Sequence, residues 1–285
     1  MKEIAPDIYV STDFGYVNVG CVIGPTGVGS LDAPPLPEEA LLWRRQISEL
    51  TEQPIVYTAI TDAHPHRLLC AHLLEAPIVA AAGAYEQAAG YSRGFWRNVV
   101  RRLRRDHPGQ ESALKGIEPE LPELLFNDRL TLHKGGRDVT LELIEGAAPG
   151  SSWVRFPDDG IAFLGDTLVV GRPPVAEACP DTKAWLNTLT MLRKSRFSGV
   201  TFVPGRGPIC DQSATEPHSE YIRLARRRIR SLHRRGETRD EVGQYVDELL
   251  SVFPLSDAER SRFRRRARNG LKQIYDDLQP DQDVG

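Results

Sequence analysis

The sequence has few sulfur-containing residues and no long hydrophobic run. Of its 285 residues only 4 are cysteine and 2 are methionine. The cysteines form no Cys-x-x-Cys pair, which disfavours a disulfide scaffold or a zinc knuckle. No stretch approaches the roughly 20 apolar residues of a membrane span, and the N-terminal MKEIAPDIYV lacks the basic start and apolar core of a signal peptide. We therefore expect a cytoplasmic protein with no membrane partner and with reduced thiols at Cys21, Cys70, Cys179 and Cys210.

Motifs of several common enzyme classes are also missing from the sequence. There is no Gly-x-Ser-x-Gly nucleophile elbow. The glycine-containing segment 146–151 lacks the Gly-Lys-Ser/Thr ending of a phosphate-binding loop. Nothing in the sequence places a base beside Ser151 or Ser152, so serine nucleophilic catalysis is not indicated.

The net charge of −3 indicates no particular partner, but the arginines are unevenly distributed. They crowd into the ranges 97–105, 223–235 and 262–268. One interpretation is solvated helix faces paired with nearby acidic residues. The other is a binding surface for an anionic polymer such as RNA. Because the overall balance is acidic and few aromatic residues lie among the arginines, we favour the first and do not expect a nucleic-acid partner.

Strand-like and helix-like segments alternate in both halves of the chain. This alternation indicates two packed sheets with helices outside them, and therefore an α/β fold. Helices are expected over 37–50, 68–74, 84–118 and 183–195 and from 218 onward. Strands are expected over 8–10, 17–23, 28–32, 55–60, 77–81, 130–133, 139–144, 153–156, 161–164 and 200–203.

Five short motifs follow one another in a fixed order, each at the end of an expected strand. They are Ser30-Leu31-Asp32, Thr61-Asp62-Ala63-His64-Pro65-His66-Arg67, Gly146-Ala147-Ala148-Pro149-Gly150-Ser151, Phe163-Leu164-Gly165-Asp166-Thr167 and Val203-Pro204-Gly205-Arg206-Gly207-Pro208. In this order they resemble the metallo-β-lactamase superfamily, in the style of its glyoxalase-II-like and lactonase-like members.

The resemblance implies a domain organisation. It implies a four-layer αββα sandwich over residues 1–215, with a helical insertion at about 84–118, and a C-terminal helical extension over 216–285 packed on that sandwich. The insertion is expected to cover the cleft and to supply Tyr91, Phe95 and Trp96 to its wall. Apolar residues of the extension either close the core of the monomer or form a seam in a homo-oligomer.

Typical members of this superfamily hold two zinc ions with His-x-His-x-Asp-His, a histidine before Pro-Gly-Ser, a Gly-Asp and a Pro-Gly-His-Gly. The metals activate a water and polarise the scissile bond. At the matching positions His64 is kept, and so is Asp166, which stands where the metal-bridging aspartate would be. The other five positions carry Asp62, His66, Arg67, Ala147 and Arg206.

The substitutions predict loss of the dinuclear metal site. Arginine has no lone pair for a metal and is cationic at any working pH. Our hypothesis is that Arg67 and Arg206 replace the charge of the metals beside Asp166. The sequence thus predicts a non-hydrolytic binding or regulatory protein without a cofactor, and with a small anionic ligand. The expected pocket consists of Asp62, His64, His66, Arg67, Ala147, Asp166 and Arg206.

Two other functions and several structural roles stay open. One zinc or other divalent ion could support hydrolysis of an ester, thioester or lactone, and the arginine-rich helices could bind nucleic acid. The residues that would hold the single ion are Asp62, His64, His66 and Asp166. The structural roles are packing or a hydrogen bond to Asp166 for His64, a surface loop for His66, a helix cap for Asp62, an exposed helix face for Arg67 and loop support for Asp32.

Overall fold

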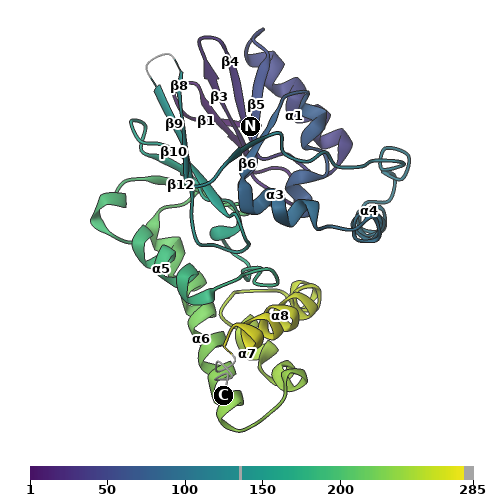
Figure 1. The fold of residues 1–285 in the computed structure, drawn as a ribbon, viewed down its shortest axis with the longest axis vertical. Helices are drawn as coiled ribbons and strands as arrows, with labels where there is room; N and C mark the ends of the chain where they lie inside the picture. The colour runs from purple at the N-terminus through teal and green to yellow at the C-terminus, as the bar shows by residue number, and fades with distance from the viewer. Residues whose placement is uncertain (135–136, 279–285) are drawn as a thin grey trace.

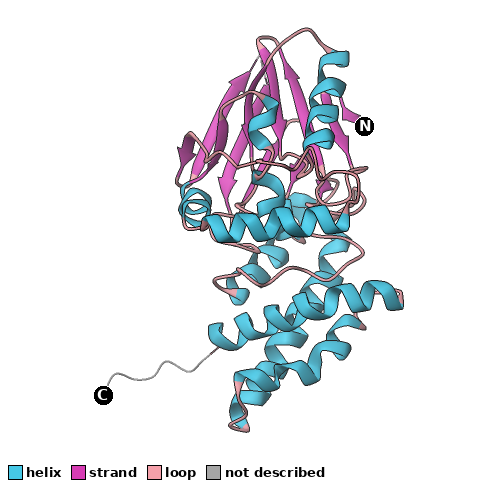
Figure 2. Cartoon of the chain, turned by 90° about the vertical axis from the view of Figure 1, so that its right-hand side faces the viewer, coloured by secondary structure: helices cyan, strands magenta, loops and turns pink. Residues whose placement is uncertain are grey.

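The computed structural model describes residues 1–134 and 137–278. Two β-sheets lie face to face, helices cover their outer faces, and a group of C-terminal helices lies beyond one end of the sandwich (Figures 1 and 2). Aliphatic and aromatic side chains from both sheets form the core between them, among them Val10, Tyr57, Phe156 and Phe163. The two sheets with helices outside agree with the architecture expected from the sequence.

The first sheet has its strands in chain order, from β1 to β7. The pairs from β1 to β4 are antiparallel and those from β4 to β7 are parallel. Carboxyl ends of the parallel strands therefore meet at one edge, where the loops after β4 and β5 leave the sheet. The strands are β1 (Lys2–Ala5), β2 (Ile8–Ser11), β3 (Val19–Gly24), β4 (Gly27–Leu31), β5 (Ile55–Ala59), β6 (Ile78–Ala81) and β7 (Leu124–Phe126).

The second sheet has the order β12-β11-β10-β9-β8. Its only parallel pair among the described strands is β11 with β12, in which Phe163 lies opposite Val203. The loops that follow these two strands thus start side by side. The strands are β8 (Arg129–Lys134), β9 (Arg137–Leu143), β10 (Ser152–Phe156), β11 (Ile161–Phe163) and β12 (Thr201–Val203).

Helices of the first half cover the outer face of the first sheet (Figure 1). In α1 (Pro37–Leu50) proline at the first turn and Glu38 and Glu39 beside it favour the helix start. The expected helix over 84–118 is two shorter helices, because Ser92 caps a new helix by accepting the amide of Phe95. These elements are α2 (Pro65–Leu68), η1 (Ala71–Leu74), α3 (Ala82–Ala89) and α4 (Arg93–Asp106).

The C-terminal helices share a hydrophobic core with the second sheet. Ile229, Leu232 and Leu249 are buried against one another and against neighbours such as Trp185 and Phe202. These apolar residues therefore close the core of the monomer instead of forming a seam. Positions 279–285 of the expected extension lie outside the described residues. The elements are η2 (Gly165–Thr167), α5 (Thr182–Leu192), η3 (Ser195–Phe197), η4 (Gln212–Ala214), α6 (Thr215–Arg234), η5 (Arg239–Tyr245), α7 (Val246–Leu250) and α8 (Asp257–Asp277).

Two strands were not expected from the sequence, namely β1 and β7 at the two edges of the first sheet. β7 carries the exposed Leu124 and Leu125, a pattern without the alternation of a half-buried strand. All four cysteines are unpaired, as expected. Within the described ranges no helix has both the length and the apolar character that a membrane span needs.

Candidate functional site

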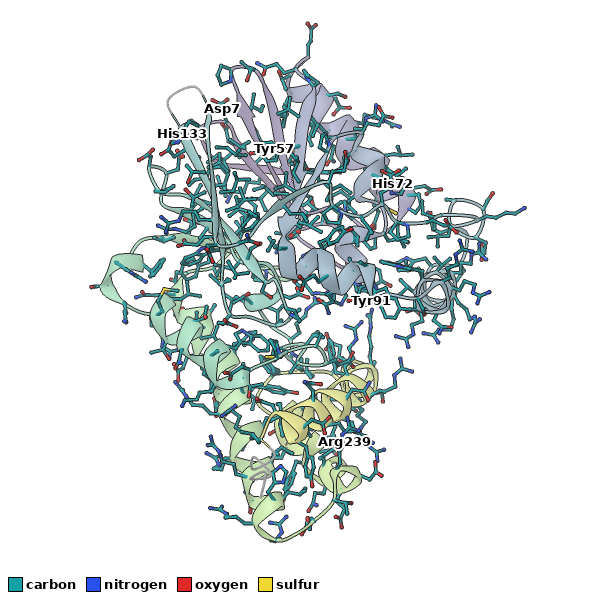
Figure 3. The ribbon with its side chains drawn as sticks, in the orientation of Figure 1. Asp7, Tyr57, His72, Tyr91, His133 and Arg239 are labelled. Carbon is teal, nitrogen blue, oxygen red and sulfur yellow. The ribbon has the colours of Figure 1, made fainter. Side chains whose placement is uncertain are left out.

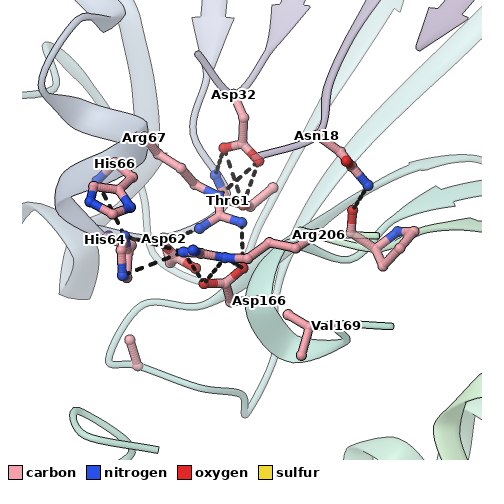
Figure 4. A network of polar contacts seen from close by, with 12 residues as sticks. Asn18, Asp32, Thr61, Asp62, His64, His66, Arg67, Asp166, Val169 and Arg206 are labelled. Carbon is pink, nitrogen blue, oxygen red and sulfur yellow. Dashed lines mark hydrogen bonds and ion pairs between the residues drawn. The ribbon is translucent and has the colours of Figure 1, made fainter. Parts of the chain in front are cut away.

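The motif residues meet where the two sheets end. Asp32 follows β4 and Asp62 follows β5, at the carboxyl edge of the parallel strands. Asp166 and Arg206 each come three residues after the paired Phe163 and Val203, so the register of β11 and β12 places them next to each other. Figure 4 shows the resulting polar network.

Arg67 is the centre of this network. Its side chain is fully buried, with 0% exposure. Its Nε donates to Oδ2 of Asp32 at 3.0 Å, its Nη1 to Oδ1 of Asp62 at 3.3 Å, and its Nη2 to Oδ1 of Asp166 at 2.8 Å. Three carboxylates therefore share one guanidinium, and the alternative that Arg67 lies on an exposed helix face is wrong.

Arg206 pairs with the same aspartate from the other side. Its Nη2 donates to Oδ2 of Asp166 at 2.9 Å, and its Nε lies 3.1 and 3.2 Å from the two carboxylate oxygens. Such a two-nitrogen contact is the strong geometry for an arginine–carboxylate pair. A side chain at Gly205 would place its Cβ 2.4 Å from Asp166 and from Arg67, so only glycine lets the backbone pass this close. The glycine of the Pro-Gly turn is thus needed by the ion pairs themselves.

The charges of the network are unequal, and the carboxyl pKa values differ accordingly. Burial would raise the pKa of Asp166, but the guanidiniums of Arg206 and Arg67 outweigh it and hold that pKa well below its usual range. For Asp32 and Asp62 burial dominates over the attraction of Arg67, and it raises the pKa of both. Of the three carboxyls, Asp166 is the one that both guanidiniums contact. Its negative charge is therefore the one that is fully compensated.

The two histidines of the first motif are neutral and partly held by the backbone. His64 Nδ1 accepts the amide of His66 at 3.2 Å and so caps α2, while Oδ1 of Asp62 accepts the amide of His64 at 2.8 Å. The cap of this helix is therefore His64 and not Asp62. Burial, reinforced by Arg206, holds the pKa of both histidines well below the usual value.

The remaining structural expectations have mixed outcomes. Asp32 accepts the amide of Thr61 at 2.9 Å and its hydroxyl at 2.9 and 3.1 Å, which is the expected loop support. His64 contacts Arg206, whose Nη2 lies 3.4 Å from Nε2, instead of bonding to Asp166. His66 is half-buried, with its ring edge-to-face against Tyr16 at 4.4 Å between centroids, so it is not a free surface loop residue.

Asn18 supports the turn that carries Arg206 and was missed in the sequence. The side-chain Nδ2 donates to the carbonyls of Pro204 and Gly207 at 2.8 Å each, and the backbone N–H of Asn18 donates to the carbonyl of Gly205 at 2.9 Å. A lone asparagine far from the motif in the chain gives no local signal of this role.

Replacing Asn18 by alanine should lower the free energy of unfolding by about 1–3 kcal/mol, because two carbonyls at the turn lose their donor. Chemical denaturation of both proteins measures this difference. Asn98→Ala, a substitution on α4 at a position with no hydrogen bond to this turn, is the control and should change stability by less than about 0.5 kcal/mol. Equal stability of Asn18→Ala and the unmodified protein would contradict the role.

A cleft of about 810 Å³ opens in front of the network. Its floor contains Asp62, His64, His66, Ala147 and Asp166, whereas Arg67 and Arg206 are not among its lining residues and lie behind the floor. The pocket thus differs from the sequence expectation for the two arginines. Five other arginines line the cleft, and the sequence did not associate them with the site. They are Arg102 and Arg105 of α4 and Arg262, Arg265 and Arg266 of α8.

The aromatic wall is partly as expected. Tyr91 and Phe95 line the cleft, but Trp96 lines a separate cavity of about 930 Å³ on the other side of α4. A third cavity, of about 560 Å³, is lined by Asp7 and Tyr57, which lie toward the far end of the sandwich from Tyr91 (Figure 3). Only the first of these three cavities adjoins the motif residues.

The side chains at the motif positions do not fit a pair of zinc ions. Both oxygens of Asp166 already accept hydrogen bonds from guanidiniums, and Arg206 also reaches the ring of His64. A divalent cation touching Asp166 would lie beside two fixed positive charges, whose repulsion opposes binding. In the part of the chain that the structure describes, no group of three or more His, Cys, Asp or Glu side chains is arranged to hold a metal ion.

Comparison with known proteins identifies the family. Residues 35–206, more than half of the chain, match the model of the metallo-beta-lactamase superfamily, and the chain belongs to this superfamily. No curated protein matches the sequence.

Solved structures with the same fold come from several organisms. A metallo-beta-lactamase from Pontibacter korlensis is 18% identical, with a TM-score of 0.59 over 75% of this chain and 94% of its own. A metallo-beta-lactamase family protein from Thermus thermophilus is 16% identical, with a TM-score of 0.66 over 95% of this chain and 93% of its own. The sec-alkylsulfatase Pisa1 from Pseudomonas sp. is 13% identical, with a TM-score of 0.72 over 99% of this chain but only 50% of its own. The predicted αββα fold with its C-terminal helices is thus confirmed.

Proposed function

We propose that this protein is a non-hydrolytic binding or regulatory member of its superfamily, which works without a divalent metal and accepts a small anionic ligand in the cleft. The observation that carries the proposal is the double pairing of Asp166 by Arg67 and Arg206, at 2.8 and 2.9 Å. The carboxylate at the metal-bridging position thereby has its charge compensated by the protein itself.

The cleft floor is poorly suited to activating a water molecule. A general base needs a free lone pair and a pKa near the working pH. The lone pair of His64 Nδ1 is used by the amide of His66, and the pKa of Asp166 is held far below neutrality. The floor consists of neutral imidazole rings and of carboxyls that already accept from Arg67, which suits recognition of a ligand better than hydrolysis.

Metal analysis tests the proposal. After purification without chelator and incubation with zinc or manganese followed by desalting, we expect far less than one metal ion per chain by elemental analysis. The reason is the repulsion between a dication and the guanidiniums of Arg67 and Arg206. The His64→Ala variant should hold the same small amount.

Stoichiometric metal that is lost in His64→Ala would contradict the proposal and favour one ion held by Asp62, His64, His66 and Asp166. Hydrolysis is measured on the same samples with an ester, a thioester and a lactone. A sec-alkyl sulfate is added because Pisa1, which shares the fold, is a sec-alkylsulfatase. Turnover that depends on added metal and on His64 would likewise overturn the non-hydrolytic function.

A nucleic-acid function receives less support from the arrangement of the arginines. On α6, Arg223 pairs with Glu216 and Arg228 with Glu248, while Arg226 is buried against Asp277. Paired guanidiniums have less charge to offer a phosphate backbone. Four arginines without such partners among the described residues, Arg102, Arg262, Arg265 and Arg266, line the cleft.

A further inference from the structure

Two helices face each other across the mouth of the cleft, although about 160 positions separate them in the chain. On α4 the cleft-lining residues Phe95, Val99, Arg102 and Leu103 recur at helical spacing, so one face of the helix is turned to the cleft. On α8 the lining residues are Arg262, Arg265, Arg266 and Asn269, again with a spacing of three or four. The α8 wall is thus cationic, whereas the α4 wall combines aromatic and aliphatic side chains with Arg102.

Arginines outnumber carboxylates at the mouth of the cleft, where the attraction of Glu177 for Arg266 only partly offsets the positive charge. The lining carboxylates at the mouth are Asp106, which pairs with its neighbour Arg105 at 3.0 Å, and Glu177, which accepts from Asn269 at 3.1 Å. Among residues 1–134 and 137–278, none forms a hydrogen bond or ion pair with the side chains of four of the five lining arginines. These four are Arg102, Arg262, Arg265 and Arg266.

Other arginines of α8 have partners outside the cleft. Arg264 pairs with Asp247 at 2.6 Å and Arg268 donates to the carbonyl of Asp240 at 3.4 Å, both away from the cleft. Since arginines of α8 that point elsewhere have partners, the unpaired state of Arg262, Arg265 and Arg266 is specific to the face that lines the cleft.

Arg266 is the most constrained member of this group. It is half-buried, and burial together with the positive charge of Arg206 lowers its pKa. Leaving a charge partly buried and unpaired is unfavourable, and an anion bound between Arg266 and its neighbours would compensate it. The cleft is therefore electrostatically complementary to an anionic group.

The opposite wall presents flat rings. Tyr91 and Phe95 stack with their centroids 4.1 Å apart and their planes at 12°, and Tyr16 lines the cleft near His66. Aromatic faces favour stacking of another flat ring. The cleft volume of about 810 Å³ lies within the roughly 300–1,000 Å³ typical of small-molecule sites.

We propose that the cleft binds an aromatic phosphate, a small molecule whose flat ring body lies against Tyr91 and Phe95 and whose phosphate is held by Arg262, Arg265 and Arg266. A nucleoside monophosphate and a simpler aryl phosphate share this chemistry. The inference rests on the proposed function, because it names the class of anion that the same cleft accepts.

Isothermal titration calorimetry in metal-free buffer tests the inference with four probes: adenosine monophosphate, phenyl phosphate, adenosine and inorganic phosphate. We expect at least one of the two aromatic phosphates to bind at least about tenfold more tightly than both adenosine and inorganic phosphate, since it uses both walls at once. Whichever of the two aromatic phosphates binds more tightly shows whether the ligand is a nucleoside monophosphate or a simpler aryl phosphate. Binding should weaken as salt is raised from about 50 to about 500 mM, because salt screens the guanidiniums.

Matched variants locate the site. Arg266→Gln should lower the affinity for the more tightly bound aromatic phosphate at least about tenfold. Arg264→Gln is the control, because Arg264 lies on the same helix but pairs with Asp247, and it should leave that affinity unchanged. Phe95→Leu keeps an apolar side chain but removes the ring. It should reduce the ratio of the affinity for the aromatic phosphate to the affinity for inorganic phosphate. Thermal melting of each variant verifies that it is folded, and Arg262→Gln replaces Arg266→Gln if the latter is not.

Several results would overturn the inference. One is equal affinity for inorganic phosphate and both aromatic phosphates; another is equal weakening by Arg264→Gln and Arg266→Gln. A third is a single-stranded oligonucleotide that binds far more tightly than any monomer, which would indicate a polymer partner. If metal and hydrolysis are found while an aromatic phosphate still binds through Arg266, the non-hydrolytic function fails and the ligand class stands. If neither metal nor hydrolysis is found and no aromatic phosphate binds through Arg266, the ligand class alone is refuted.

Discussion

Replacing Arg67 by methionine is expected to lower the free energy of unfolding by roughly 3–5 kcal/mol, or to prevent folding altogether. The side chain is fully buried and donates to Asp32, Asp62 and Asp166. Methionine fills much of the volume but leaves three buried carboxyls with no shared cation. Chemical denaturation of the unmodified protein and the variant measures the loss.

The control is Arg44→Met, which removes a surface pair with Glu75 whose partners are 38% and 66% exposed. Such a pair contributes little, so the change should stay below about 1 kcal/mol. Arg206→Ala and Asp166→Asn test the second half of the network and should also cost on the order of 3–5 kcal/mol. If these two variants melt at the same temperature as the unmodified protein, the ion pairs do not carry the stability assigned to them.

The second large effect is loss of stability in acid through His218 of α6. This ring is buried, its Nδ1 accepts the amide of Val169 at 3.4 Å, and burial lowers its pKa to about 4. In the unfolded chain the same group has a pKa near 6.5. The unfolded state thus binds more protons below pH 6.5, so stability is fully present above that pH and is lost as pH falls toward 4. Between pH 7.5 and pH 5 this one histidine should cost about 2 kcal/mol.

His218→Gln isolates this contribution from that of other buried groups. Glutamine offers an acceptor for Val169 but does not titrate. The stability of the unmodified protein minus that of the variant, measured by denaturation at each pH, should fall by about 2 kcal/mol between pH 7.5 and pH 5. A difference that is the same at both pH values would mean that His218 is not held neutral in the folded state.

Much of the site could be predicted because its spacing follows strand register. The motifs after β11 and β12 each place their functional residue three positions beyond a paired strand residue, so Asp166 and Arg206 had to be neighbours once the two strands were parallel. Asp32 and Asp62 likewise follow the paired ends of the parallel strands β4 and β5, one position beyond Leu31 and three beyond Ala59. The end of a strand can be recognised from the local sequence. Adjacent parallel strands then bring the residues that follow them close together at one edge of the sheet.

The direction of Arg67 and the charge at the cleft mouth could not be predicted in this way. Arg67 lies on the one-turn helix α2, where a rotation of the helix decides between solvent and the sheet edge. The arginines of α8 meet α4 only through the packing of the C-terminal helices on α5 and the second sheet. A run such as Arg264-Arg265-Arg266 looks the same on a solvated helix and on a binding wall, since only the tertiary fold determines which members find acidic partners.

The positive charge beside Asp166 is covalently part of the chain. A metal ion exchanges with its surroundings, so a metalloprotein alternates between loaded and empty forms according to supply, chelators and acidity. Guanidinium groups have no empty form, because arginine keeps its proton at every physiological pH. The charge that Arg67 and Arg206 place beside Asp166 is consequently set once, when the chain folds.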